Sequence, residues 1–227
     1  MKPDTESPKK EGRRGGEPLK VLLCDDHGIT RCGVKQVLEK EFPRVQFGEA
    51  DDAAQALALF TRESWSLVLL DINLPGPSGL ELLDEMKTLK PRVPILMLSG
   101  LSEREFGWRA LRSGAAGYLA KTCIVTELKD AVGKVLAGGK YISSVTAEEL
   151  ATRLAREESE APHQDLSVRE FQVLRLIAAG KAMKEIAAEL ALNAKTASTY
   201  RARLCSKLRI TSDAEITRYA LQHGLID

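Results

Sequence analysis

The chain has 227 residues, a net charge of +1 and a charged fraction of 29%, which give no global signal for nucleic-acid binding. Its hydrophobic fraction of 44% supports folded cores, and its length allows more than one domain. We find neither an apolar run near the roughly 18–20 residues of a membrane span nor a signal peptide, so we expect a cytoplasmic protein with no membrane partner. Four dispersed cysteines without a CxxC pair argue against a disulfide framework and structural zinc.

The first segment, residues 1–17, is polar and lacks an apolar cluster, so we predict a flexible tail. From Lys20 onward, candidate strands and helices alternate with short connections, which predicts a parallel α/β sheet. The predicted strands are Leu19–Cys24, Val45–Glu49, Leu67–Asp71, Val93–Leu98 and Gly117–Leu119. The predicted helices are Ile29–Lys40, Ala53–Arg62, Gly79–Leu89, Glu103–Ser113 and Thr126–Ala137. We therefore expect a flavodoxin-like, doubly wound, five-stranded domain over residues 18–139.

The stretch from Leu67 to Pro75 is an apolar run that ends in the carboxylate of Asp71, as in a buried strand with a reactive tip. The strand Leu19–Cys24 ends in a second acidic group, Asp25 and Asp26. Side by side, these strands would gather carboxylates that a hard cation such as Mg²⁺ neutralises. An alternative interpretation is that Asp25 and Asp26 only cap the next helix.

Two further strands end in polar residues, Ser99 and Lys121. Taken singly, a serine at this place is usually a helix cap and a lysine is usually a solvated surface residue. Because the carboxyl ends of parallel strands meet at one edge of a sheet, their recurrence in this order predicts a site there.

These residues, between Pro18 and Gly139, resemble the receiver domains of two-component response regulators. The resemblance implies that Asp71 is the phosphoacceptor. It implies a Mg²⁺ site formed by Asp25, Asp26, Asp71 and the backbone carbonyl of Asn73. It implies phosphate or switch roles for Ser99, Tyr118 and Lys121.

Residues 140–163 are acidic and alanine-rich with few apolar anchors, so we predict a partly helical linker that separates two cores. Residues 164–227 read as four helices. Capping boxes at Ser167 and Ser212 open the first and the last, and the other two are Met183–Leu190 and Ala194–Leu208. Their predicted shared core is Leu176, Ile186, Leu190, Leu204 and Leu208.

The helix Ala194–Leu208 carries basic residues and no acidic residue, and it follows a short helix and a polar turn. A charge run is usually a solvated face, but this order is typical of a helix-turn-helix. From Asp165 onward the chain resembles the DNA-binding domain of LuxR/FixJ-type regulators. By position, the groove-facing candidates are Ser198, Thr199 and Ala202. The candidates for phosphate contacts are Lys195, Thr196, Arg201, Arg203 and Lys207.

Together these resemblances imply a response regulator of the NarL/FixJ family that is a transcription factor and not an enzyme. The implied partners are a sensor histidine kinase, double-stranded promoter DNA and, after phosphorylation, a second copy of the chain, with RNA polymerase as a further candidate. Two other classes stay open. An aspartyl-phosphate phosphatase would have a second aspartate where this chain has Asn73, and an interaction module regulated without phosphate would keep the fold with a degenerate site.

Overall fold

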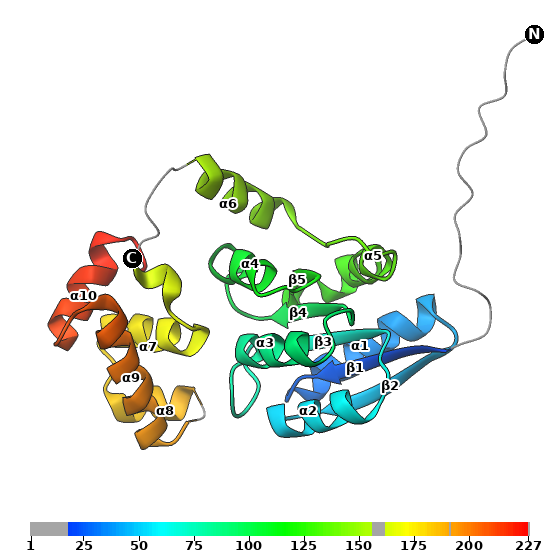
Figure 1. The fold of residues 1–227 in the computed structure, drawn as a ribbon, viewed down its shortest axis with the longest axis horizontal. Coiled ribbons are helices and arrows are strands. Elements are labelled where there is room, and N and C mark those ends of the chain that lie inside the picture. Colours follow the sequence, from blue (N-terminus) through cyan, green and yellow to red (C-terminus); the bar gives the residue numbers. More distant parts are fainter. Residues whose placement is uncertain (1–17, 156–161, 191, 227) are drawn as a thin grey trace, which may run out of the picture.

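The computed structural model describes residues 18–155, 162–190 and 192–226, so the predicted tail over residues 1–17 and part of the predicted linker lie outside it. The first domain contains a parallel sheet in the order β2-β1-β3-β4-β5 (Figure 1). Its strands are β1 (Leu19–Cys24), β2 (Val45–Ala50), β3 (Leu67–Asp71), β4 (Ile95–Ser99) and β5 (Gly117–Ala120). Its helices are α1 (Gly28–Glu41), α2 (Ala53–Arg62), α3 (Gly79–Leu89), α4 (Glu103–Arg112) and α5 (Ile124–Leu136). The predicted doubly wound fold is confirmed.

Both faces of the sheet are covered, which explains the unbroken apolar strands. Leu67 and Leu69 of β3 pack in the core that holds α1 and α5, whereas Val68 and Leu70 pack in the core that holds α2, α3 and α4. Adjacent residues thus serve opposite layers, and every residue of β3 is buried. The strand can therefore hold Asp71 at its end without exposing any apolar side chain.

The C-terminal domain is a group of helices: α7 (Val168–Ala178), α8 (Met183–Glu189), α9 (Ala194–Leu208) and α10 (Asp213–Gln222). The predicted capping boxes at Ser167 and Ser212 both form. Asn193 caps α9 by accepting a hydrogen bond from the backbone N–H of Thr196, and left-handed Arg209 ends it. Ile186, Leu204 and Leu208 are buried in the shared core. Leu176 and Leu190 pack against that core from half-buried positions.

The predicted linker contains a formed helix, α6 (Ser144–Ala155), which lies along α4 (Figure 1). Glu103 at the start of α4 accepts hydrogen bonds from the hydroxyls of Ser143 and Thr146, the latter at 2.7 Å. A Cβ atom at Gly107 would lie 2.5 Å from the Thr146 hydroxyl, so the glycine permits this close approach. Part of the linker is therefore attached to the first domain.

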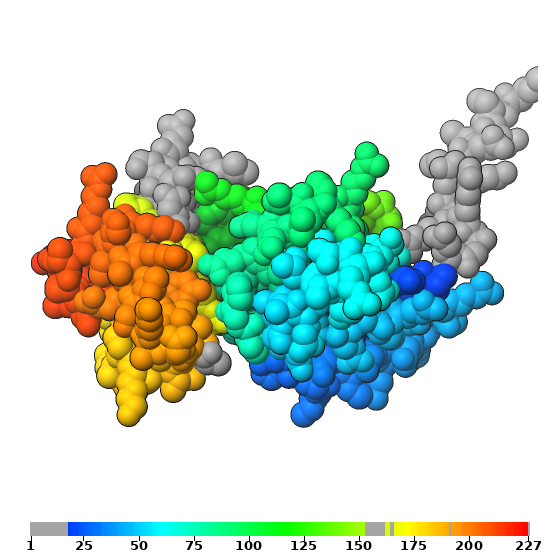
Figure 2. All heavy atoms as spheres, turned by 60° about the horizontal axis from the view of Figure 1, so that its bottom comes forward, coloured from blue at the N-terminus to red at the C-terminus, as the bar shows by residue number. Residues whose placement is uncertain are grey.

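The expectation that the linker separates two cores is wrong. The core beneath α2, α3 and α4 continues into that of the C-terminal domain, where Phe106 of α4 meets Phe171 of α7 edge to face at 5.8 Å between ring centroids. Figure 2 shows the orange and yellow atoms of the C-terminal helices against the green and teal atoms of the first domain. The sequence pattern missed this joining because each apolar residue also fits the core of its own domain.

Candidate functional site

The acidic residues at the ends of β1 and β3 meet at one edge of the sheet. Asp25 and Asp71 are 3% and 1% exposed, while Asp26 lies at the surface. Together with His27, these residues offer ligand atoms that all lie within 4.8 Å of one another. The cluster exists because β1 and β3 are parallel neighbours, paired from Val21 with Leu67 to Cys24 with Leu70.

Lys121, directly after β5, reaches into this cluster. Its Nζ lies 2.7 Å from Asp71 Oδ2 and 2.8 Å from Asp25 Oδ2. Burial lowers the pKa of the Lys121 amine, but the hydrogen bonds and charges of Asp25 and Asp71 outweigh it, and the pKa is raised. Burial raises the pKa of Asp71, although Lys121 opposes this. The ammonium thus partly neutralises a carboxylate that would otherwise be costly to bury.

Ser99 and Tyr118 both contact the backbone of Leu101, in the loop that leads into α4. The Leu101 N–H donates to Ser99 Oγ at 3.0 Å, and the Tyr118 hydroxyl donates to the Leu101 carbonyl at 2.9 Å. Both side chains are fully buried, and burial raises the pKa of Tyr118. Together they connect the site edge of the sheet to the start of α4.

The loop after β3 is held close to Asp71. The backbone N–H of Asn73 donates to Asp71 Oδ1 at 3.1 Å. The N–H of Gly79, at the start of α3, donates to the Ile72 carbonyl at 2.8 Å. A Cβ atom at position 79 would lie 2.0 Å from the Asp71 carbonyl oxygen, so only glycine allows this approach. The tight turn fixes the backbone on both sides of Asn73.

Two residues near the acids were missed by the sequence analysis. The His27 Nδ1 lies 2.7 Å from Asp26 Oδ1 and 3.1 Å from Asp25 Oδ1. The Arg31 guanidinium donates to the Asp25 carbonyl. The adjacency of His27 to the acidic pair was a signal in the sequence, whereas Arg31 is brought back only by the path of α1.

The donor set fits a hard divalent cation. Carboxylates are the oxygen ligands that Mg²⁺ prefers. The Oδ2 atom of Asp25 is buried and faces positive charge, because the Lys121 ammonium lies 2.8 Å away. Buried carboxylates are costly unless positive charge compensates them, and a divalent cation bound beside Asp25 and Asp26 would add to the compensation that Lys121 supplies.

The side chains expected to contact DNA lie on the accessible part of α9. Lys195, Ser198, Thr199, Ala202, Arg203 and Lys207 are exposed, and Thr196 and Arg201 are half-buried. The opposite face of α9 is buried through Ala197, Tyr200, Leu204 and Leu208. Lys207 also pairs with Glu170 at 2.7 Å, and Arg201 pairs with Asp213 at 2.7 Å. The orange atoms of this region form part of the surface in Figure 2.

The fold and its acidic edge thus define a receiver-type regulatory domain joined to a helix-turn-helix domain. Residues 21–133 match the family model described as response regulator receiver domain, and residues 164–220 match that of bacterial regulatory proteins, luxR family. Within the described ranges, no helix is both long and apolar enough to cross a membrane.

Proteins of similar sequence match nearly the whole chain. Response regulator UvrY of Escherichia coli strain K12 is 35% identical over 208 residues, covering 91% of this chain and 95% of the relative. Response regulator GacA of Pseudomonas aeruginosa is 34% identical over 210 residues, covering 92% and 98%. A structure of RcsB from Salmonella typhimurium shares the fold, with a TM-score of 0.56, 24% identity and coverage of 89% and 97%. The chain belongs to the NarL/FixJ family of response regulators and is a transcription factor with a LuxR-type DNA-binding domain.

Proposed function

We propose that a sensor histidine kinase transfers a phosphoryl group to Asp71, and that the phosphorylated chain dimerises and binds promoter DNA through α9. The observation that carries this proposal is the buried Asp71 carboxylate, which lies 2.7 Å from the Lys121 ammonium beside Asp25. A nucleophilic carboxylate, an adjoining ammonium and further acids are the groups that phosphoryl transfer requires.

In the transfer, a carboxylate oxygen of Asp71 attacks the phosphorus of the kinase phosphohistidine. The phosphorus–nitrogen bond breaks, and its electron pair returns to the imidazole, which takes up a proton. Lys121 stabilises the negative charge that spreads over the phosphoryl oxygens. Asp25, Asp26, Asp71 and the Asn73 carbonyl would hold Mg²⁺, which supplies further charge neutralisation.

Phosphorylation would then change the contacts of Ser99 and Tyr118. It adds roughly −1.5 to −2 charge and new acceptor oxygens at the edge of the sheet. Because both side chains bind the backbone of Leu101, a shift of either one moves the loop into α4. That helix contacts both α6 and the C-terminal domain, so it can pass the change on to α9.

DNA binding is supported by the exposed basic side chains on α9. Arg203 and Lys195 would contact phosphates, which position a protein without reading sequence, while Ser198, Thr199 and Ala202 would face base edges. The related regulator RcsB has been solved in a complex with DNA. By analogy, the dimer would bring two copies of α9 to neighbouring half-sites.

The direct test is labelling by a small acyl phosphate in the presence of Mg²⁺. The wild type should acquire a phosphoryl group that hydroxylamine removes, and Asp71→Asn should acquire none, because an amide is a poor nucleophile for phosphorus. Asp84→Asn, which removes an exposed carboxylate from α3, is the matched control and should label like the wild type. Equal labelling of Asp71→Asn would place the phosphoacceptor elsewhere. Turnover of a phosphomonoester would favour the phosphatase class.

A further inference from the structure

The first helix of the DNA-binding domain, α7, is hydrogen-bonded to the loop that follows Asp71. The Gln172 Nε2 donates to Asn73 Oδ1 at 2.9 Å, and the Arg169 Nη2 donates to the Leu74 carbonyl at 3.1 Å. Arg169 also donates to Gln172 Oε1 at 3.1 Å, so the two side chains act as a pair. The residues they contact follow Asp71 closely in the chain, and Asn73 belongs to the expected metal site.

Arg169 carries a buried charge at this contact. It is 3% exposed, and its hydrogen bonds go to neutral acceptors. In the part of the chain that the structure describes, no carboxylate lies within ion-pair distance of it. Burial lowers the pKa of its guanidinium. The negative charges of ionised Tyr200, of Glu81 and of Asp71 raise that pKa and so oppose the effect of burial. The field of the acidic residues therefore helps to keep this charge in the interface.

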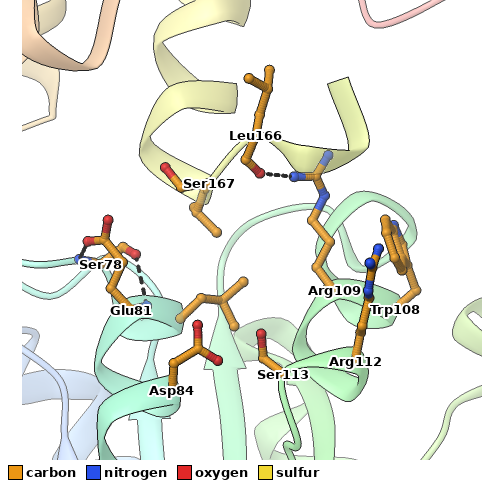
Figure 3. A pocket seen from close by; sticks show the side chains of 11 residues that line it. Ser78, Glu81, Asp84, Trp108, Arg109, Arg112, Ser113, Leu166 and Ser167 are labelled. Carbon is orange, nitrogen blue, oxygen red and sulfur yellow. Dashed lines mark hydrogen bonds between the residues drawn. The ribbon is translucent and has the colours of Figure 1, made fainter. Parts of the chain in front are cut away.

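The rest of the interface holds α7 and the preceding segment against α4. Arg109 is 9% exposed and donates to the carbonyls of Leu166 and His163, the latter at 2.9 Å. Arg175 pairs with Glu105 at 2.8 Å. Between α3, α4 and this segment lies a cavity of about 360 Å³, bordered by Trp108 and Ser167 (Figure 3). The two domains are thus joined at separate points around an open pocket.

We infer that Arg169 and Gln172 are positioning residues through which docking of the DNA-binding domain and Mg²⁺ binding oppose each other. This inference rests on the proposed function, because it takes the acidic cluster as the Mg²⁺ site. Bound Mg²⁺ would add two positive charges beside Asp71, one of the acids whose negative charge favours the Arg169 guanidinium. The buried charge then loses favourable interaction, and the docked arrangement becomes less stable.

Thermodynamic reciprocity also determines the effect of docking on Mg²⁺ binding. If Mg²⁺ weakens docking, docking must weaken Mg²⁺ binding by the same factor. The hydrogen bonds at Asn73 and Leu74 add to this effect, because they hold the loop that carries Asn73, whose carbonyl would be a ligand of the metal. α7 would therefore regulate phosphorylation of Asp71 by setting the Mg²⁺ concentration that the site requires.

The test is a Mg²⁺ titration of the full-length chain, followed by intrinsic tryptophan fluorescence, since Trp108 borders the interface cavity. Arg169→Gln and Gln172→Ala should each lower the half-saturating Mg²⁺ concentration, by about fivefold for Arg169→Gln, which is the lower end of typical allosteric coupling. Small-angle scattering should show that Mg²⁺ increases the radius of gyration of the wild type. The variants should be expanded before Mg²⁺ is added.

Lys184→Gln is the matched control, because it removes a positive charge from an exposed position on α8 of the same domain. It should leave the titration unchanged. A melting curve for each variant checks that it is folded. If Arg169→Gln unfolds, Gln172→Ala still tests the coupling, because Gln172→Ala leaves the buried charge of Arg169 in place.

The outcomes separate the two hypotheses. A wild-type Mg²⁺ response that Asp26→Ala does not weaken contradicts the proposed metal site itself. A normal, Asp26-dependent response that is the same in folded Gln172→Ala overturns the coupling alone. If Lys184→Gln also bound Mg²⁺ more tightly, the tighter binding would be due to the lower net charge of the variants, and the coupling would be overturned.

Discussion

The two layers of helices that cover the sheet have different neighbours. The layer of α1 and α5 encloses a core in which every residue comes from residues 19–141. The layer of α2, α3 and α4 shares its core with the DNA-binding domain, through contacts such as Phe106 with Phe171. One layer therefore stabilises only the receiver, and the other joins the receiver to its effector.

This difference indicates which layer can transmit the signal. Ser99 and Tyr118 act on Leu101, which leads into α4, and Asn73 and Leu74 lead into α3. Both connections from the proposed phosphorylation site thus enter the layer that contacts α7. A change at Asp71 can reach the DNA-binding domain without passing through α1 or α5.

The largest expected effect comes from truncating one aromatic side chain of the shared core. Phe106→Ala should lower the free energy of unfolding by about 3–5 kcal/mol and should also free the DNA-binding domain, because its ring packs on Phe171. Leu128→Ala, in the closed layer, should cost about 2–5 kcal/mol without changing the docking. Urea unfolding measures the first quantity, and small-angle scattering measures the second.

An equal increase in the radius of gyration for both variants would contradict the claim that only the layer of α2, α3 and α4 holds the DNA-binding domain. It would mean that docking depends on receiver stability in general. An increase confined to Phe106→Ala would show that the α4 surface itself holds the domain.

A smaller effect tests whether the exposed side of α9, which is proposed to bind DNA, acts independently of the interface between the two domains. Thr199→Ala should cost roughly 1–3 kcal/mol of discrimination at the base pair it contacts. Arg203→Ala should weaken binding about equally on cognate and scrambled DNA and should reduce the salt slope by ~1 per subunit, because one fewer counterion is released. Binding titrations at two salt concentrations distinguish these effects.

Both side chains are exposed, so neither substitution should change the melting temperature. If Thr199→Ala lost stability while keeping its sequence preference, Thr199 would be a packing residue and not a base contact.

The smallest expected effect concerns the charge on Asp71 in the absence of metal. Burial raises the pKa of Asp71, so the folded state binds its proton more tightly than the unfolded state does. The stability gained from this group is present at low pH and is lost as the pH rises through the folded-state pKa. Asp71→Asn should therefore melt at a higher temperature than the wild type at pH 7.

The difference in melting temperature between Asp71→Asn and the wild type should shrink as the pH falls and Asp71 becomes protonated. Mg²⁺ should reduce it at pH 7, because the metal stabilises the wild type more. A variant that melts below the wild type at pH 7 would mean that the Lys121 contact more than offsets the burial of the charge.

Local pattern determined the elements of this protein. The bounds of β1, β3, α2, α3 and α9 agree with their sequence predictions, because apolar runs, capping residues and glycines act within a few residues of one another. The rule that parallel strands end at a common edge was enough to predict that Asp25, Asp71 and Lys121 meet. Their separations confirm it.

Only the tertiary structure decided how the two domains join. In the sequence, Arg169 and Gln172 are ordinary polar residues on an amphipathic helix, and their partners in the loop after Asp71 lie 95 and 99 residues away. The attachment of α6 to α4 is equally hidden, because it depends on the missing side chain of Gly107 and on hydroxyls beyond the receiver. Periodicity shows which side of a helix is apolar, but the surface that covers it is chosen by shape and charge across the whole fold.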